Sequence, residues 1–379
     1  MTWQTKKLGD MCVVGAGNSA PQKREFFVDG THPFFRTSDV GAVHIGSIKE
    51  SSDYLNESGI KKMRLFKKGT ILFPKSGAST FLNHRVIMGV DGYASSHLAT
   101  IKTDGSTLDD NYLFYFLLEV RVQDLIQDHK YPSLNLPVIE RIQISFPDSL
   151  GEQKRIVKKL DEVFEKVMKA KEAAEKNLQN AKELFESYLQ SVFANPGKDW
   201  EKKTLREMCD ELSAGGDVPK GNFSKIRSEK YSIPIFANGE KNKGLYGYTS
   251  IRKIAKPSIT VSARGTIGYS EIRREPFFPI VRLIVLTPNE QMVDLFFLYY
   301  IAHNFKFSNT GTSIPQLTIP MIENIKIALP SLNEQRTIVK KLETLSVETK
   351  KLEKIYERKL ADLEELKKSV LSRAFTGGL

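Results

Sequence analysis

The chain has 379 residues, 40% of them hydrophobic, and a formal net charge of +11 at pH 7. This length accommodates two globular cores and additional extended helix. The positive charge favours a polyanionic partner, because lysine and arginine side chains release the counterions condensed on nucleic-acid phosphates. The sequence has no apolar run of 18 residues, no signal peptide and no lipidation motif. We therefore expect a soluble, intracellular protein without a membrane partner.

The cysteine and histidine content argues against a metal site. Cys12 and Cys209 are the two cysteines, too few for a disulfide scaffold and without the CxxC spacing of a zinc site. The six histidines form no pair at ligand spacing. We expect buried thiols and no bound metal.

An internal repeat organises the whole chain. Residues 3–12 return as residues 200–209, with Trp, Leu, Met and Cys at the same offset of 197. A second shared segment carries Glu152 and Gln153 in the first copy and Glu334 and Gln335 in the second, at an offset of 182. The second copy is therefore shorter within its globular part.

Each copy begins with a segment of mixed strand and helix character. In the first copy, β-type runs at 69–73 and 98–102 precede a helical pattern at 111–118. In the second copy the corresponding strands are 257–261 and 282–287, and the helical pattern is 293–300. These patterns predict an α+β fold for both globular halves.

A long polar helix follows each globular half. Ser149 with Glu152, and Ser331 with Glu334, fit the capping box, in which Ser accepts from the N3 amide and Glu reaches back to the cap amide. Apolar residues then recur at spacings of three and four, which predicts that the two helices pack as an antiparallel coiled coil. The predicted boundaries are 1–148, helix 149–193, linker 194–199, 200–330 and helix 331–375.

The coiled coil has an expected length and register. About 43 residues of helix span roughly 65 Å, so we expect the globular halves at opposite ends of a spacer. The expected register places Ala174 against Leu352 and Leu160 against Leu366.

Two Trp-started repeats, each followed by a Pro-(Ser)-Leu-x-Glu-Gln-x-x-Ile-Val helix, resemble the specificity subunit of type I restriction-modification enzymes along essentially the whole chain. The resemblance implies that each globular half is a target-recognition domain for one half of a bipartite site in double-stranded DNA. It implies that the helices dock adenine methyltransferase (M) subunits, and that restriction and motor (R) subunits complete a cytoplasmic complex. S-adenosylmethionine, ATP and magnesium would bind those partners, so this chain itself would be non-catalytic and hold no cofactor.

Two motifs suggest other functions. Residues 13–20 imitate a dinucleotide-binding glycine pattern, but Pro21 follows at once and the second copy lacks the pattern. Asp148 with Glu152 and Lys154 resembles a nuclease carboxylate set, yet Ser331 stands where the second copy would need the acid. The sequence also lacks a phosphate loop and the Asn/Asp-Pro-Pro-aromatic motif of adenine methyltransferases. A solitary nuclease or methyltransferase, and a scaffold whose coiled coil spaces two partners, are the alternatives to a specificity subunit.

The candidate DNA-binding residues lie in polar, basic and glycine-containing loops bracketed by predicted strands and in two segments, 130–135 and 311–316, that precede the long helices. Arginine and lysine can pair with phosphates or with the acceptor edge of guanine, and amide side chains can read adenine. A solvated loop or a proline-stiffened connection explains each segment equally well. The candidates are Arg36, Thr37, Ser38, Lys75, Ser76, His97, Lys130, Tyr131, Ser133 and Asn135 in the first copy, and Ser262, Arg264, Thr266, Thr312, Ser313 and Gln316 in the second.

Overall fold

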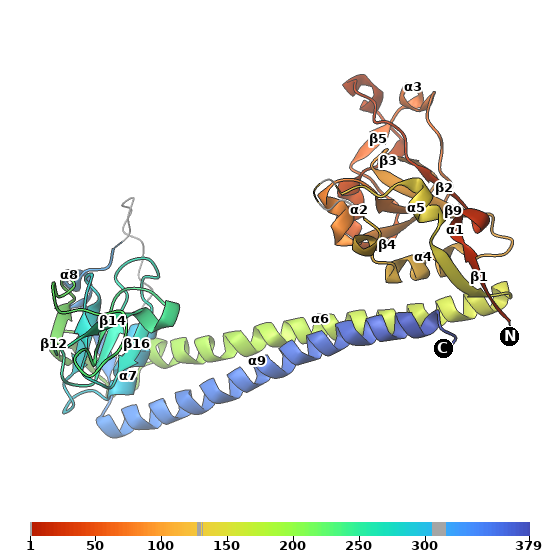
Figure 1. Ribbon diagram of the computed structural model, residues 1–379. Coiled ribbons are helices and arrows are strands. Elements are labelled where there is room, and N and C mark those ends of the chain that lie inside the picture. The colour runs from red at the N-terminus through yellow and green to blue at the C-terminus, as the bar shows by residue number, and fades with distance from the viewer. Residues whose placement is uncertain (1, 127–129, 131, 305–315) are drawn as a thin grey trace. The chain divides into compact units, whose positions relative to one another are not determined.

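The computed structural model describes residues 2–126, 130, 132–304 and 316–379, and it separates into two compact units. Unit 1 comprises residues 1–174 and 358–379, and unit 2 comprises residues 175–357. Each unit holds one globular half and parts of both long helices, α6 (Leu150–Ala194) and α9 (Leu332–Ala374) (Figure 1). Each repeat therefore builds a hydrophobic core of its own.

Unit 1 is an α+β fold with three sheets. A five-stranded sheet has the order β2 (Cys12–Ala16), β9 (Leu98–Thr103), β6 (Ile71–Pro74), β7 (Arg85–Met88), β4 (Ile45–Ile48). A smaller sheet has the order β5 (Asp53–Leu55), β3 (His32–Phe35), β8 (Tyr93–Ala94), and β1 (Trp3–Lys7) pairs with β10 (Gln143–Pro147). The helices are α1 (Leu8–Met11), α2 (Thr37–Val43), α3 (Glu57–Ile60), α4 (Asp110–Glu119) and α5 (Leu136–Glu140).

Unit 2 repeats this topology. Its main sheet has the order β12 (Cys209–Ala214), β18 (Ile284–Pro288), β15 (Ser258–Val261), β16 (Ser270–Arg273). The smaller sheet is β14 (Leu245–Thr249), β13 (Ile233–Phe236), β17 (Phe278–Pro279), and β11 (Glu201–Thr204) pairs with β19 (Lys326–Leu329). The helices α7 (Leu295–Asn304) and α8 (Ile319–Ile322) complete it. The α+β prediction and the tandem arrangement are confirmed.

An insertion in unit 1 accounts for much of the difference in length between the copies. Residues 36–52, between β3 and β5, contain α2 and β4. The corresponding residues 237–244, between β13 and β14, form only a short 3-10 turn. Because β4 adds a fifth strand beside β7, the main sheet of unit 1 is one strand wider.

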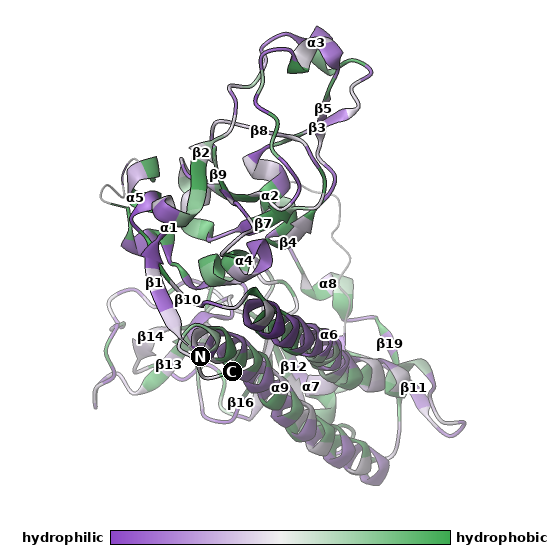
Figure 2. Ribbon diagram, turned by 90° about the vertical axis from the view of Figure 1, so that its right-hand side faces the viewer, coloured by the Kyte–Doolittle hydropathy of each residue, from purple (hydrophilic) through white to green (hydrophobic). Residues whose placement is uncertain are grey.

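The long helices pack antiparallel. In unit 1, Ile156 near the start of α6 shares a core with Leu371 near the end of α9. In unit 2, Leu189 near the end of α6 shares a core with Val339 near the start of α9. Figure 2 colours most of both helices purple, with the green residues confined to part of each helix. The predicted pairing of two amphipathic helices is confirmed.

Two leucines that we expected to fill the seam between the long helices are partly exposed. Leu160 is buried, whereas Leu366 is 46% exposed and Leu352 is 37% exposed, so neither of the latter fills a closed seam. In unit 1 the Lys171 ammonium instead lies 2.8 Å from the Glu364 carboxylate. A straight helix drifts by about 20° per heptad, so residues assigned to the seam by heptad spacing rotate out of it.

The capping-box carboxylates have other partners. The Glu334 amide reaches the Ser331 hydroxyl at a long 3.4 Å, while its carboxylate accepts from the Trp200 indole N–H at 3.0 Å. The Glu152 carboxylate accepts from the Arg155 guanidinium at 2.7 and 2.8 Å. The expectation that these carboxylates return to the cap amides is therefore corrected, because a nearby arginine engages Glu152 and a distant indole engages Glu334.

A buried glutamine ties the globular half of unit 1 to its helix. The Gln153 side-chain carbonyl accepts from the Asp109 amide at 2.8 Å. Its side-chain N–H groups donate to the carbonyls of Thr107 and Pro147, both at 2.9 Å. One α6 side chain thereby satisfies three backbone groups from the end of β10 and from the segment that leads into α4.

Gln335 makes the same three bonds in unit 2. It accepts from the Asp294 amide at 2.8 Å and donates to the carbonyls of Met292 at 2.9 Å and Pro330 at 2.8 Å. The repeated Glu-Gln pair in the sequence is the signal of this contact. In the expected capping box, only the glutamate of that pair has a role.

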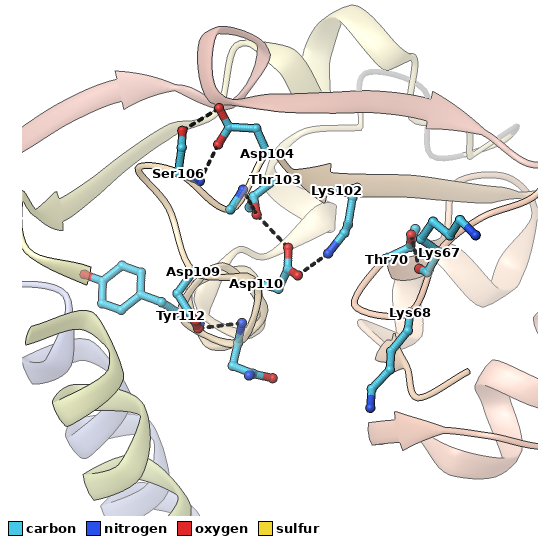
Figure 3. Close-up of polar contacts among 12 residues, drawn as sticks. Lys67, Lys68, Thr70, Lys102, Thr103, Asp104, Ser106, Asp109, Asp110 and Tyr112 are labelled. Atoms are coloured by element: carbon cyan, nitrogen blue, oxygen red, sulfur yellow. Dashed lines mark hydrogen bonds and ion pairs between the residues drawn. The ribbon is translucent and has the colours of Figure 1, made fainter. Parts of the chain in front are cut away.

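The start of α4 is fixed by two consecutive aspartates (Figure 3). The Asp109 carboxylate caps the helix by accepting from the backbone amides of residues 111 and 112 at 2.9 and 3.1 Å. Asp110 forms an ion pair with Lys102 and accepts from the Thr103 hydroxyl at 2.6 Å. Because Lys102 and Thr103 belong to β9, these contacts hold the helix against the main sheet.

The glycine-rich segment at 13–20 has a packing role. A Cβ at Gly17 would lie 2.2 Å from the backbone oxygen of Ser95, and the next residue, Asn18, forms a parallel bridge with Ser95. In unit 2 a Cβ at Gly215 would lie 2.6 Å from the backbone nitrogen of Ile280. The glycines thus allow two backbone segments to cross closely, which explains the pattern without a nucleotide.

Candidate nucleic-acid interface

Three segments of unit 1 meet beyond the end of β6. The Lys75 amide donates to the His97 carbonyl at 2.9 Å, and the Leu134 amide donates to the Lys75 carbonyl at 2.7 Å. The Ser76 hydroxyl and the His97 Nδ1 are 2.8 Å apart, and Ser133 forms a β-bridge with Ser76. The structure therefore brings together the candidates Lys75, Ser76, His97 and Ser133, which we call cluster 1.

The equivalent segments of unit 2 meet in the same way. The Leu317 amide donates to the Ala263 carbonyl at 2.9 Å, matching the backbone contact that Lys75 makes in cluster 1. Beside it, the Arg264 Nε and Nη2 groups donate to the Gln316 Oε1 at 3.1 and 2.6 Å. We call Arg264 and Gln316, together with the exposed Arg282 of the segment that Asn238 links to residue 263, cluster 2.

A glycine follows the central residue of both clusters. Gly77 has φ +80° and Gly265 has φ +72°, a conformation that favours glycine. Among the described residues, leaving out each glycine's two chain neighbours, no heavy atom lies within 4 Å of where a Cβ would stand at either position. Within that part of the chain, the backbone beside Ser76 and Arg264 therefore leaves room for a ligand to approach.

Sequence reasoning missed Arg282. It occupies the place of His97, since the residues that follow them are both buried, Leu98 at the start of β9 and Leu283 immediately before β18. The Asn238 side chain donates to the Val281 carbonyl at 2.6 Å and accepts from the residue 263 amide at 2.8 Å. Asn238 thereby joins the segment of Arg282 to that of Arg264. An alignment of the two copies around His97 would have found this exposed arginine.

The segment 36–39 is not the loop that we expected. Thr37 and Ser38 begin helix α2, because the carboxylate of the buried Asp39 accepts from the Arg36 amide at 2.7 Å. The Arg36 guanidinium forms an ion pair with Asp53 of β5. Arg36, Thr37 and Ser38 thus belong to the inserted helix beside the small sheet.

Ser262 is a second correction. Its side chain is 1% exposed, and its hydroxyl accepts from the Gly239 amide at 3.0 Å. A buried hydroxyl that already supports a neighbouring loop does not face a ligand, so Ser262 is removed from the candidate surface.

The other candidates are not included in clusters 1 and 2. Lys130, Asn135 and Thr266 are exposed, and Asn135 directly precedes α5. Tyr131, Thr312 and Ser313 lie outside the described residues.

Positive charge is concentrated near cluster 2 in the sequence. Residues 217–256, which include β13 and β14, hold nine lysines and arginines against three acidic residues. The Lys225 ammonium lies 3.5 Å from the centroid of the Tyr246 ring and donates to the Tyr246 carbonyl at 2.9 Å. Such a segment can attract a polyanion, and its aromatic ring is held beside a cation.

Burial shifts the pKa of several ionisable groups in the described chain, including two thiols and a guanidinium. Burial raises the pKa of the Cys12 and Cys209 thiols to about 12, so both are protonated at neutral pH. Burial lowers the pKa of Arg85 to about 10, and its guanidinium lies 4.5 Å from the centroid of the Phe73 ring. Arg85 therefore stays charged at neutral pH within the main sheet of unit 1.

Among the described residues, no helix has the length and apolar character of a membrane span. Within that same part of the chain, no three His, Cys, Asp or Glu side chains gather as ligands for a metal ion.

The family comparison matches the repeat. The family model of the type I restriction modification DNA specificity domain matches residues 1–177 and again residues 197–360. The chain belongs to this family. It is a DNA specificity subunit of the type I restriction-modification class, and specificity subunits are non-catalytic.

Curated relatives include several specificity subunits. A putative type I specificity subunit of Mycoplasma pneumoniae is 28% identical over 255 residues, which cover 66% of this chain and 68% of the relative. Another from the same organism is 34% identical over 152 residues, covering 39% of this chain and 45% of the relative. The MjaVIII specificity subunit of Methanocaldococcus jannaschii is 24% identical over 416 residues, covering 99% of this chain and 92% of the relative.

Two solved structures share the fold. The HsdS subunit from Thermoanaerobacter tengcongensis has a TM-score of 0.68 at 20% identity, covering 100% of this chain and 97% of that one. A chain from a structure that addresses complex assembly and conformational transition of the type I R-M system has a TM-score of 0.78 at 21% identity, covering 100% of this chain and 98% of that one.

Proposed function

We propose that the two units of this specificity subunit read the two halves of a bipartite DNA site, one half each. The observation that carries the proposal is the repetition of one surface feature: clusters 1 and 2 are built from equivalent segments around equivalent open glycines. Their side chains nevertheless differ, with Ser76 and His97 in one and Arg264 and Arg282 in the other. Equivalent surfaces with different donors and acceptors suit two different base sequences.

The basic segment of unit 2 supplies the sequence-independent part of binding. Lysine and arginine contacts to phosphates position a protein on the duplex, while contacts to base edges specify the sequence. Residues 217–256 have the charge for the first task, and cluster 2 has the directed donors for the second.

The chain directs chemistry that other subunits perform. We infer that adenine methyltransferase subunits bind it, and that restriction and motor subunits join them in the cytoplasm for cleavage. S-adenosylmethionine, ATP and magnesium then bind those partners. This inference is supported by family membership and by the absence of phosphate-loop and methyltransferase motifs from the sequence.

A segment exchange tests the proposal. Residues 200–330 are replaced by the corresponding segment of a related specificity subunit, the complex is assembled with methyltransferase subunits, and methylated adenines are mapped by sequencing. We expect one half of the recognised sequence to change and the other to remain.

The reciprocal exchange of residues 1–148 is the matched control and should change only the other half. Simultaneous change of both halves in a folded, active complex would show that the units do not read DNA independently.

A further inference from the structure

Arg264 is held in one orientation by a neutral side chain. Its Nε and Nη2 groups both donate to the Gln316 Oε1, at 3.1 and 2.6 Å, across 52 residues of sequence. The neighbouring backbone contact between residues 317 and 263, at 2.9 Å, keeps the two segments together. Because an amide rather than a carboxylate accepts these bonds, the described pair keeps the full positive charge of the guanidinium.

The contact leaves a paired donor group available. A guanidinium has five N–H groups in one plane, and Gln316 engages the edge formed by Nε and Nη2. The other edge, formed by Nη1 and Nη2, still presents two parallel N–H groups. That fork matches the O6 and N7 acceptors of guanine in the major groove.

The surroundings of Arg264 leave room for the edge of a DNA base to approach its guanidinium. Arg264 is exposed, and the adjacent Gly265 has open space where a Cβ would stand. Arg282, also exposed, lies on a segment that Asn238 joins to the residue 263 amide. Asn238 thus brings the backbone of the segment that carries a second exposed cation close to the segment of Arg264.

The equivalent place in unit 1 is chemically different. Ser76 stands at the position of Arg264, and its hydroxyl is 2.8 Å from the His97 ring nitrogen. A hydroxyl and an imidazole do not form the planar double donor of an arginine. Of these two equivalent positions, the one in unit 2 carries an arginine with its paired donors, and the one in unit 1 does not.

We propose that the Arg264–Gln316 pair recognises a guanine in the half-site read by unit 2. Arg264 donates to the O6 and N7 of that base, and Gln316 is a positioning residue that orients the guanidinium. This inference rests on the proposed function, since it names a base within the half-site assigned to unit 2.

The first test uses the full chain assembled with its methyltransferase subunits and a library of duplex sites. The half-site of unit 2 is identified by the exchange of residues 200–330. We expect a guanine in it, and Arg264→Ala should reduce the preference for that guanine about 10- to 100-fold at one position. The control is Arg274→Ala, which removes an exposed arginine that lies over the Phe296 ring and belongs to neither cluster. It should leave this preference intact.

A base analogue tests whether Arg264 contacts the N7 atom of the guanine. Replacing the guanine by 7-deazaguanine removes the N7 acceptor while retaining Watson–Crick pairing. The analogue should weaken binding by the unaltered complex and have little further effect on the Arg264→Ala complex. Independent, multiplicative losses would overturn the proposed contact.

Gln316 variants test positioning. Gln316→Leu should lower the guanine preference at the same single position without altering the other positions. Gln316→Glu should retain the preference but weaken overall binding, because a carboxylate still holds the fork while cancelling its charge. Loss of preference at every position in both variants would instead indicate a merely structural role.

Different experimental results would contradict the guanine contact and the proposed function. Suppose that the exchange of residues 200–330 changes one half-site. If that half lacks guanine, the inference is wrong. If Arg264→Ala weakens binding to all sequences equally and lowers the salt dependence, Arg264 contacts phosphate and the inference is also wrong. If the exchange leaves both half-sites unchanged in an active complex, the proposed function itself is wrong.

Discussion

Replacing Gln335 by alanine should destabilise unit 2 strongly, although the residue belongs to neither cluster. Gln335 is buried and makes three hydrogen bonds of 2.8 to 2.9 Å to the backbone of residues 292, 294 and 330. Alanine removes all three and leaves the backbone groups without this partner. At a net value of about 1 kcal/mol for each bond, the free energy of unfolding should fall by about 3 kcal/mol.

Urea unfolding followed by fluorescence measures this loss. The chain has two tryptophans, Trp3 in unit 1 and Trp200 in unit 2. In a Trp3→Phe background the signal comes from Trp200, whose indole donates to Glu334 beside Gln335. With a slope of about 2 kcal/mol per molar urea, the midpoint should fall by about 1.5 M.

Two further variants isolate the hydrogen bonds. Gln335→Met keeps the volume but loses the bonds, so it should be nearly as unstable as Gln335→Ala. Gln179→Ala removes an exposed glutamine of α6 and should change stability by less than about 0.5 kcal/mol. Equal midpoints for Gln335→Ala and Gln179→Ala would refute the assignment of Gln335 as the link between helix and globular half.

Three shorter predictions concern other described positions. Gly215→Ala should lower the free energy of unfolding by about 1 to 3 kcal/mol, because the Cβ would lie 2.6 Å from a backbone nitrogen, whereas Gly216→Ala meets nothing within 4 Å and should be nearly neutral in the same urea assay. Since burial raises the pKa of Cys209 to about 12, its thiolate is scarce at pH 8, and mass spectrometry should detect iodoacetamide alkylation only after unfolding; rapid labelling of the native chain would contradict this. Ala174→Leu should overpack a buried α6 position by about 1 to 3 kcal/mol, while Ala173→Leu at the exposed neighbour should not; comparable melting temperatures would argue against a packed interface there.

The sequence by itself determined the repeat, the α+β character of each half and the two long helices. These features depend on local chemistry that the chain displays directly. Pro147 and Pro330 precede the helices, Ser149 and Ser331 stand immediately before their first residues, and apolar residues recur at helical spacing. The family resemblance rested on the same local motifs, and the comparison confirmed it.

Part of the candidate surface was also visible in the sequence. Lys75, Ser76 and Arg264 were selected from loops beside predicted strands, and Gln316 from the segment before the second long helix. The structure gathers them, with His97, into two clusters. Residue type and position in a connecting segment were sufficient to select them, because such segments commonly carry binding groups.

Only the tertiary structure decided which partners these side chains have. The Arg264–Gln316 contact spans 52 residues, and the contact between Trp200 and Glu334 spans 134, so neither follows from local spacing. Solvent exposure also differs between Ser262 and Arg264, which are two residues apart. Ser262 is buried and its hydroxyl accepts from the Gly239 amide, whereas Arg264 is exposed. These contacts and exposures depend on how segments distant in the sequence pack against each other. Local sequence propensity does not encode that packing, because a side chain can bond only with the groups that the tertiary fold places next to it.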